Sequence, residues 1–85
     1  MIKVVIESPF AGDVVRNVKY ARLCLADSLK RGEGIKAGLE WGRKADLRAV
    51  YIDYGITKGM EMGIKDAKKI RQPIEYRRIL DNEKI

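Results

Sequence analysis

Two acidic residues in the second half of the chain have side chains that could support sugar chemistry. Asp53 follows the short apolar run of residues 49–52, and Glu61 lies in a helical pattern that begins soon afterwards. A pair of carboxyl groups can cleave or transfer a glycosidic bond, one as nucleophile and the other as acid, base or anchor for a sugar hydroxyl. Both residues also have a structural interpretation, since Asp53 would cap the following turn and Glu61 would pair with Lys65. Spacing alone leaves both interpretations open.

The elements around Asp53 would place it beside a ligand crevice. Residues 49–52 are typical of a buried parallel strand, Asp53 and Gly55 then form a turn, and a helix is predicted over residues 56–70. In an open α/β sheet, ligands bind beyond the carboxyl ends of the strands. The start of the helix near Thr57 would also direct free backbone N–H groups toward that crevice. We therefore expect one wall of any active site in this stretch.

The first elements would bring further side chains to the same crevice. Residues 2–7 are rich in β-branched side chains and predict a strand, and Asp13 is a suitable N-cap for a helix that extends to about Lys30. The positions predicted to face the sheet recur every three or four residues along this helix: Val14, Val18, Ala21, Leu25 and Leu29. Three residues of its first turns would reach the crevice or, alternatively, remain on the surface: Arg16, Asn17 and Tyr20.

The remaining pattern completes an α/β fold. A second helix is predicted over residues 35–44, after a break at residues 31–34, and a last strand over residues 74–79. The order β-α-α-β-α-β with short connections predicts one domain over residues 1–85, a small Rossmann-like, three-layer fold with a short, mostly parallel sheet. Three strands leave open sheet edges and a thin core, so we expect a homo-oligomer, a dimer or larger.

Two glycine-rich segments resemble each other. Residues 34–42 and 55–63 both place glycine at every fourth position, and Glu40 and Glu61 occupy equivalent positions. An interior glycine costs a helix about 1 kcal/mol relative to alanine. Helices accept that cost where backbones approach closely, so we expect these glycine faces to pack on each other or on the sheet.

Composition narrows the classes of chemistry. The chain contains no histidine, which removes the commonest general base and metal ligand. It has no zinc-ligand spacing, P-loop or dinucleotide-binding glycine motif, and we expect neither a metal nor a cofactor. The single cysteine, Cys24, lies among apolar helical residues and is interpreted as a core residue in a reducing cytoplasm. No apolar run is long enough for a membrane span or signal peptide, so we expect a cytoplasmic protein with no membrane partner.

The net charge of +6 comes from 18 lysines and arginines against 12 acidic residues. A basic surface attracts phosphates, on nucleotides or on nucleic acids. Here the basic residues are scattered, which is typical of a solvated surface. Trp41 and Tyr54 could stack on a base, although a core or interface role is the alternative for Trp41. A nucleic-acid-binding module is the least favoured hypothesis, because the chain has no helix-turn-helix signature or aromatic platform.

Two segments resemble nucleoside 2-deoxyribosyltransferase-like proteins, a family with small uncharacterised members in phages and bacteria. The segment VVIESPFAGD at residues 4–13 is similar to the opening of the family, in which the first strand ends in a Gly/Ser-Pro-Phe/Tyr turn and the next helix carries an Asn. The segments YIDYGIT at residues 51–57 and GMEMG at residues 59–63 resemble its second motif, an Asp-x-Gly turn followed by a helix with Glu-x-Gly. The resemblance covers most of the chain.

In the characterised enzymes of that family, the glutamate attacks the anomeric carbon of a deoxynucleoside, and an acceptor base then displaces the covalent deoxyribosyl-enzyme. The resemblance therefore implies an N-glycosyl (deoxyribosyl) transferase or hydrolase of a nucleoside or nucleotide, with Glu61 as nucleophile and Asp53 holding the sugar. It implies that Phe10 and Tyr20 line the base pocket. The other substrate-binding residues that it implies are Ser8, Gly12, Asn17, Gly55 and Thr57.

Two departures from the family pattern bear on catalysis. Gly-Ile-Thr-Lys-Gly-Met precedes Glu61, whereas the enzymes usually have Gly-Thr followed directly by the two residues before the glutamate. Relatives also carry an extra segment, with a second strand and an active-site loop, at the position of residues 31–35. A loss of this segment would remove part of the base-binding wall. It would favour a second hypothesis, a non-catalytic protein that binds or sequesters a nucleotide derivative.

Overall fold

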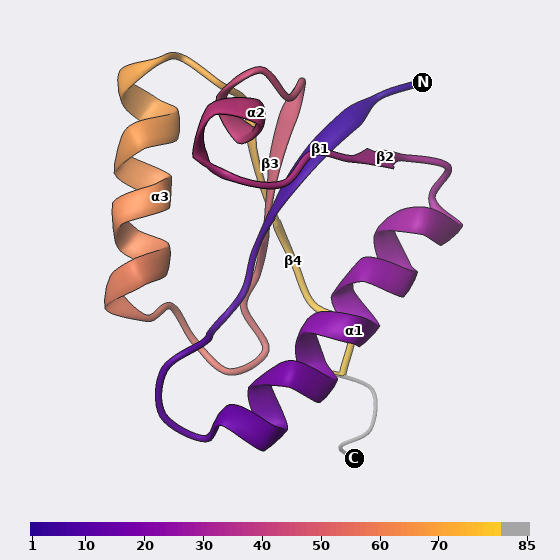
Figure 1. Cartoon of the computed structure of the whole chain (residues 1–85), viewed down its shortest axis with the longest axis vertical. Coiled ribbons are helices and arrows are strands. Elements are labelled where there is room, and N and C mark those ends of the chain that lie inside the picture. Colours follow the sequence, from indigo (N-terminus) through magenta and orange to yellow (C-terminus); the bar gives the residue numbers. More distant parts are fainter. Residues whose placement is uncertain (81–85) are drawn as a thin grey trace.

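Four parallel strands form the centre of the molecule, and the computed structural model describes residues 1–80 of the chain. The elements are β1 (Lys3–Glu7), α1 (Val14–Lys30), β2 (Gly34–Ile35), α2 (Leu39–Arg43), β3 (Leu47–Tyr51), α3 (Lys58–Lys69) and β4 (Ile74–Arg77). The strands lie in the order β2-β1-β3-β4, and each neighbouring pair is parallel. Figure 1 shows the sheet between α3 on the left and α1 on the right. The predicted α/β fold with a short parallel sheet is confirmed.

Alternate residues of β3 contact different helices. Ala49 and Tyr51 pack with Tyr20 of α1, whereas Val50 packs with Met60 of α3. Successive side chains of a strand point to opposite faces of the sheet. Helix α1 therefore covers one face and α3 the other, which gives the three layers expected from the sequence.

The helix predicted over residues 35–44 is wrong in its first part. Gly34 and Ile35 form β2 instead, paired in parallel with Lys3 and Val4 of β1. The helix itself is restricted to Leu39–Arg43. Gly38, directly before it, has a φ of +84°, a left-handed conformation that glycine adopts readily and that interrupts a helix. The sheet thus gains a fourth strand of two residues that the sequence pattern did not predict.

Helix α1 has the predicted ends but a different buried face. The Asp13 carboxylate caps it by accepting a hydrogen bond from the backbone N–H of Arg16 at 3.0 Å. Its buried residues are Asn17, Tyr20, Cys24 and Ser28. The predicted sheet-facing residues other than Ala21 are instead 39–56% exposed: Val14, Val18, Leu25 and Leu29. Burial of Asn17 and Ser28 is tolerated because hydrogen bonds inside the protein offset the loss of contact with water.

A buried ion pair connects β4 to the segment between α1 and β2. The Arg77 guanidinium donates hydrogen bonds to the two carboxylate oxygens of Glu33 at 3.0 and 2.7 Å. It also donates to the hydroxyl of Tyr51 at 2.9 Å and to Glu75. Glu33 accepts a further hydrogen bond from the Ser28 hydroxyl at 2.6 Å. These contacts hold the α1 side of the sheet together across distant parts of the sequence.

The longest helix of the described chain is α1, with 17 residues. Neither α1 nor any other helix within residues 1–80 combines the length and the apolar character that crossing a membrane requires.

Candidate functional site

The strand order reverses between β1 and β3. From β1 the chain passes to β2 on one side, and the next strand, β3, lies on the other side of β1. At such a reversal, α/β proteins commonly bind ligands beyond the carboxyl ends of the strands. The loops at this position are residues 8–13 after β1 and residues 52–57 after β3. Most site residues predicted from the sequence lie in or beside these two loops.

The carboxylate of Asp53 is fully engaged inside the protein. It accepts hydrogen bonds from the Tyr20 hydroxyl at 2.6 Å and from the backbone N–H groups of Ile79 and Leu80 at 2.9 Å each. Burial acts to raise the pKa of Asp53, but these hydrogen bonds outweigh it and hold the pKa below its usual value. The structure thus brings Tyr20 and Asp53 together, in an arrangement that anchors residues 79 and 80 to α1 and β3.

Asn17 shapes the loop after β1. Its side-chain N–H group donates hydrogen bonds to the backbone carbonyl oxygens of Phe10 at 3.1 Å and Ala11 at 2.9 Å. Its side-chain oxygen accepts hydrogen bonds from Arg16. Ser8, Phe10 and Asn17 border a groove of about 420 Å³ beside α1, and the Phe10 ring is exposed. These three predicted residues are therefore neighbours.

Three other predicted residues determine the local course of the chain in the two loops: Gly12, Gly55 and Thr57. Gly12 and Gly55 have positive φ angles of 97° and 84°, which suit glycine. Thr57 is the N-cap of α3, and its hydroxyl accepts a hydrogen bond from a backbone N–H of the first turn. Glu61 lies in that first turn and is exposed. Among the described residues it forms no ion pair, so the alternative pairing with Lys65 is not formed.

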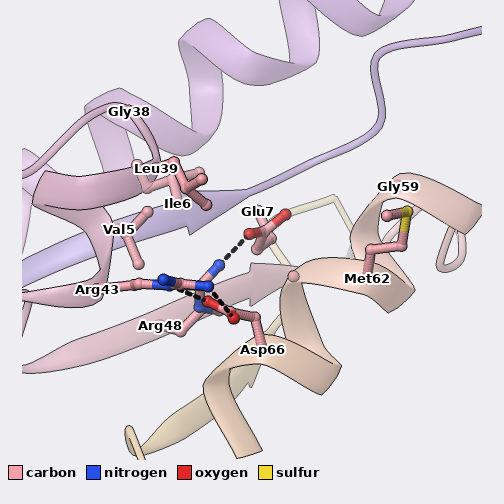
Figure 2. A pocket seen from close by; sticks show the side chains of 11 residues that line it. Val5, Ile6, Glu7, Gly38, Leu39, Arg43, Arg48, Gly59, Met62 and Asp66 are labelled. Atoms are coloured by element: carbon pink, nitrogen blue, oxygen red, sulfur yellow. Dashed lines mark hydrogen bonds and ion pairs between the residues drawn. The ribbon is translucent and has the colours of Figure 1, made fainter. Parts of the chain in front are cut away.

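A larger pocket, of about 600 Å³, lies on the α2 and α3 side of the sheet (Figure 2). We name it the Glu7 pocket, and its lining residues are Val5, Ile6, Glu7, Gly38, Leu39, Arg43, Arg48, Gly59, Met62, Gly63 and Asp66. The lining residues from α3 are at positions i, i+3, i+4 and i+7 of the helix and so share one side of it: Gly59, Met62, Gly63 and Asp66. Glu61 falls outside this spacing and does not line the pocket.

Glycines allow α2 and α3 to approach β1 on either side of the Glu7 pocket. A Cβ atom on Gly42 would lie 3.0 Å from Cγ2 of Val5, and one on Gly63 would overlap the Glu7 carboxylate. The predicted packing of the two glycine faces on the sheet is confirmed for one glycine of each segment, Gly42 and Gly63. Gly34 lies in β2 instead of a helix, and Gly38 and Gly55 lie in loops with open space around them. Gly59 is different, since it lines the pocket and has open space around it.

The floor of the pocket is a buried ion pair. Arg48 is 5% exposed, and it donates from Nη1 to Oε2 of Glu7 and from Nε to the side-chain oxygen of Gln72 (Figure 2 shows the pair with Glu7). Gln72 donates in turn to the backbone carbonyl oxygens of Gly42 and Ala45, which fixes the arginine. Burial raises the pKa of Glu7, and the opposing effect of Arg48 is smaller. The pocket therefore contains a partly buried carboxyl group held in one orientation.

Sequence reasoning missed both members of this pair. The predicted strand begins at residue 49, whereas β3 begins at Leu47 and includes Arg48. A charged residue within an otherwise apolar strand could have indicated a buried ion pair, because a buried arginine requires an acidic partner. Glu7, at the end of the first predicted strand, is the matching carboxylate.

Fold and pocket together define a small α/β protein with a parallel sheet and an ion pair beneath a pocket of ligand size. A family model described as "Domain of unknown function (DUF7768)" matches residues 27–77, more than half of the 85 residues, and the chain belongs to this family. The match spans every lining residue of the Glu7 pocket except those from β1. No curated protein and no solved structure matches the chain.

Proposed function

We propose that this protein binds a nucleoside or nucleotide in the Glu7 pocket. The observation that carries the proposal is the ion pair of Glu7 and Arg48 beneath apolar walls. Val5, Leu39 and Met62 can cover the flat faces of a base or sugar, while the floor can hydrogen-bond to a polar edge. The volume of about 600 Å³ is typical of small-molecule sites. The resemblance to nucleoside 2-deoxyribosyltransferase-like proteins supports this class of ligand.

Isothermal titration calorimetry with the four common deoxynucleosides tests the proposal. Leu39→Asp places a charge in the apolar wall at a position that is 73% exposed, so the fold should tolerate it. We expect the affinity to fall at least about tenfold. Leu23→Asp is the matched control, because Leu23 is an exposed leucine on α1, which covers the other face of the sheet. The proposal is wrong if the unmodified protein binds no nucleoside, or if both variants lose affinity equally.

Transfer or hydrolysis of the N-glycosidic bond, with Glu61 as nucleophile, is the second candidate function. It is favoured by the position of Glu61, which is exposed in the first turn of α3 and free of ion pairs within residues 1–80. Three observations favour binding without catalysis. The Asp53 carboxylate is occupied by internal donors, Glu61 does not line the Glu7 pocket, and only residues 31–33 separate α1 from β2.

A chromatographic assay of deoxynucleosides and deoxynucleotides with free bases separates the two candidates. Release or exchange of a base that disappears in Glu61→Gln and persists in Glu40→Gln would support glycosyl chemistry with Glu61 as nucleophile. Glu40 is the matched control because it has the equivalent place in the similar segment on α2. Base release that survives in Glu61→Gln would place the nucleophile elsewhere. Ligand binding without turnover would support the binding protein.

Assembly into a homo-oligomer stays a prediction, as does a cytoplasmic location. The exposed apolar residues of α1 provide a surface that a second copy would cover. Sedimentation equilibrium measures the assembly, and Leu25→Asp should shift it toward monomer because Leu25 is one of these exposed residues. A monomer at all accessible concentrations would contradict the prediction.

A further inference from the structure

Two arginines and two carboxylates meet in the Glu7 pocket. Glu7 and Arg48 form the floor, and Arg43 and Asp66 form a second pair that joins α2 to α3 (Figure 2). The pairs differ in exposure, because the Arg48 side chain is 6% exposed and the Arg43 side chain 49%. An ion pair that faces water contributes little to stability, so Arg43 can change partner at low cost.

Arg48 keeps one donor atom for a ligand. Its Nη1 is bound to Glu7 and its Nε to Gln72. Within residues 1–80, Nη2 of Arg48 forms no hydrogen bond. Every fully buried side-chain nitrogen or oxygen in this part of the chain has a partner. Arg48 lines the Glu7 pocket, and Nη2 is the nitrogen of its guanidinium that remains for a ligand. The pocket contains a donor in a fixed position that the described residues leave unsatisfied.

The charges around Asp66 favour an incoming anion. The hydrogen bond from Arg43 contributes most to lowering the pKa of Asp66, and the charges of Arg48 and Lys69 add to the effect. Three cations thus act on one carboxylate. A phosphate carries more negative charge than a carboxylate and can accept two parallel hydrogen bonds from an arginine. It can therefore replace Asp66 as the partner of Arg43, and Asp66 remains close to Lys69 and water.

We propose that Arg43 exchanges Asp66 for the phosphate of a nucleotide, with Nη2 of Arg48 as the second donor. This inference rests on the proposed function and narrows the ligand from a nucleoside to a nucleoside phosphate. Arg43 is the mobile binding residue and Arg48 the fixed one. Asp66 is an internal competitor that occupies Arg43 in the free protein.

Two variants of the same ion pair test the exchange. Calorimetry compares each of the four deoxynucleosides with its 5′-monophosphate, for the unmodified protein, Arg43→Gln and Asp66→Asn. We expect the unmodified protein to bind the monophosphate at least about tenfold more tightly than the nucleoside. The preference should disappear in Arg43→Gln and rise severalfold in Asp66→Asn, because the competitor is gone. The readout is the ratio of the two affinities measured on the same protein, because Arg43 and Asp66 line the pocket and their replacement also acts on the nucleoside.

The opposite directions of change distinguish ligand binding from a structural role. A purely structural pair would shift the preference in the same direction in both variants, since each breaks the same contact, and that result would overturn the exchange. Equal affinity of the unmodified protein for nucleoside and monophosphate would overturn the inference and leave the proposed function standing. Binding of neither ligand would overturn both.

Discussion

Replacing Arg77 with methionine should destabilise the protein by about 3–5 kcal/mol, because it leaves the Glu33 carboxylate buried without its cation. The two side chains are 3% and 11% exposed, so water cannot replace the lost hydrogen bonds. Of the described contacts of Glu33, the hydrogen bond from Ser28 would remain. The Tyr51 hydroxyl would also lose a donor. Methionine preserves much of the arginine volume, so the change acts chiefly on charge and hydrogen bonding.

That loss is large for a chain of this size. At 0.05–0.15 kcal/mol per residue, the free energy of unfolding is roughly 4–13 kcal/mol in total. Urea unfolding followed by far-UV circular dichroism measures the change, and the thermal midpoint should fall by about 12 °C or more. Arg43→Met is the matched control, because Arg43 also donates two hydrogen bonds to one carboxylate but faces water. Its midpoint should stay close to that of the unmodified protein.

The pH dependence gives an independent check. The hydrogen bond from Arg77 lowers the pKa of Glu33 below its ordinary value of 4.5, with burial acting in the opposite direction. A carboxylate with a lowered pKa in the folded state stabilises the protein above its ordinary pKa, and that contribution is lost as the pH falls through the lowered value. The unmodified protein should therefore lose stability below pH 4.5 more steeply than Arg77→Met. A loss under about 1 kcal/mol in Arg77→Met, with parallel pH profiles, would refute the reasoning.

Three further predictions concern glycine packing, a buried hydroxyl and a buried thiol. Gly63→Ala should lower the thermal midpoint, because the new methyl group displaces the Glu7 side chain. Gly59 has open space around it, so Gly59→Ala should stabilise α3 by about 0.5 kcal/mol. Equal effects of the two substitutions would contradict the packing of Gly63 against Glu7. Tyr20→Phe should cost about 1–3 kcal/mol of unfolding free energy in a urea titration, because the partly buried backbone N–H of Asp53 loses its acceptor and the Asp53 carboxylate loses a donor. Burial raises the pKa of Cys24 to about 12, so iodoacetamide should modify this thiol at pH 8 only after unfolding, as followed by mass spectrometry.

Local signals predict most of the secondary structure. The β-branched run of residues 2–7 and the Asp13 cap identify β1 and the start of α1, because these features depend on neighbours in the sequence. The buried face of α1 could not be found in this way. A periodicity analysis treats Asn17 and Ser28 as exposed, yet they are buried because a loop carbonyl and Glu33 satisfy them.

The candidate site was predictable only where it follows a motif. Tyr20 and Asp53 both come from segments with a recognisable pattern, and the structure joins them by a hydrogen bond. The Glu7 pocket depends instead on which strands are neighbours and in what register. Pairing of Val5 with Arg48 aligns β1 and β3 so that Arg48 can reach Glu7, and no local pattern contains that register.

The contacts of Glu33 and Asp53 have a consequence for biosynthesis. Both carboxylates leave the ribosome well before their partners. Arg77 provides a guanidinium to Glu33, and Ile79 provides a backbone N–H to Asp53. Until β4 has been made, closing the earlier elements around these carboxylates would bury charges without their partners. The nascent chain should therefore stay open and accessible to chaperones and proteases until β4 emerges, and then fold in one cooperative step.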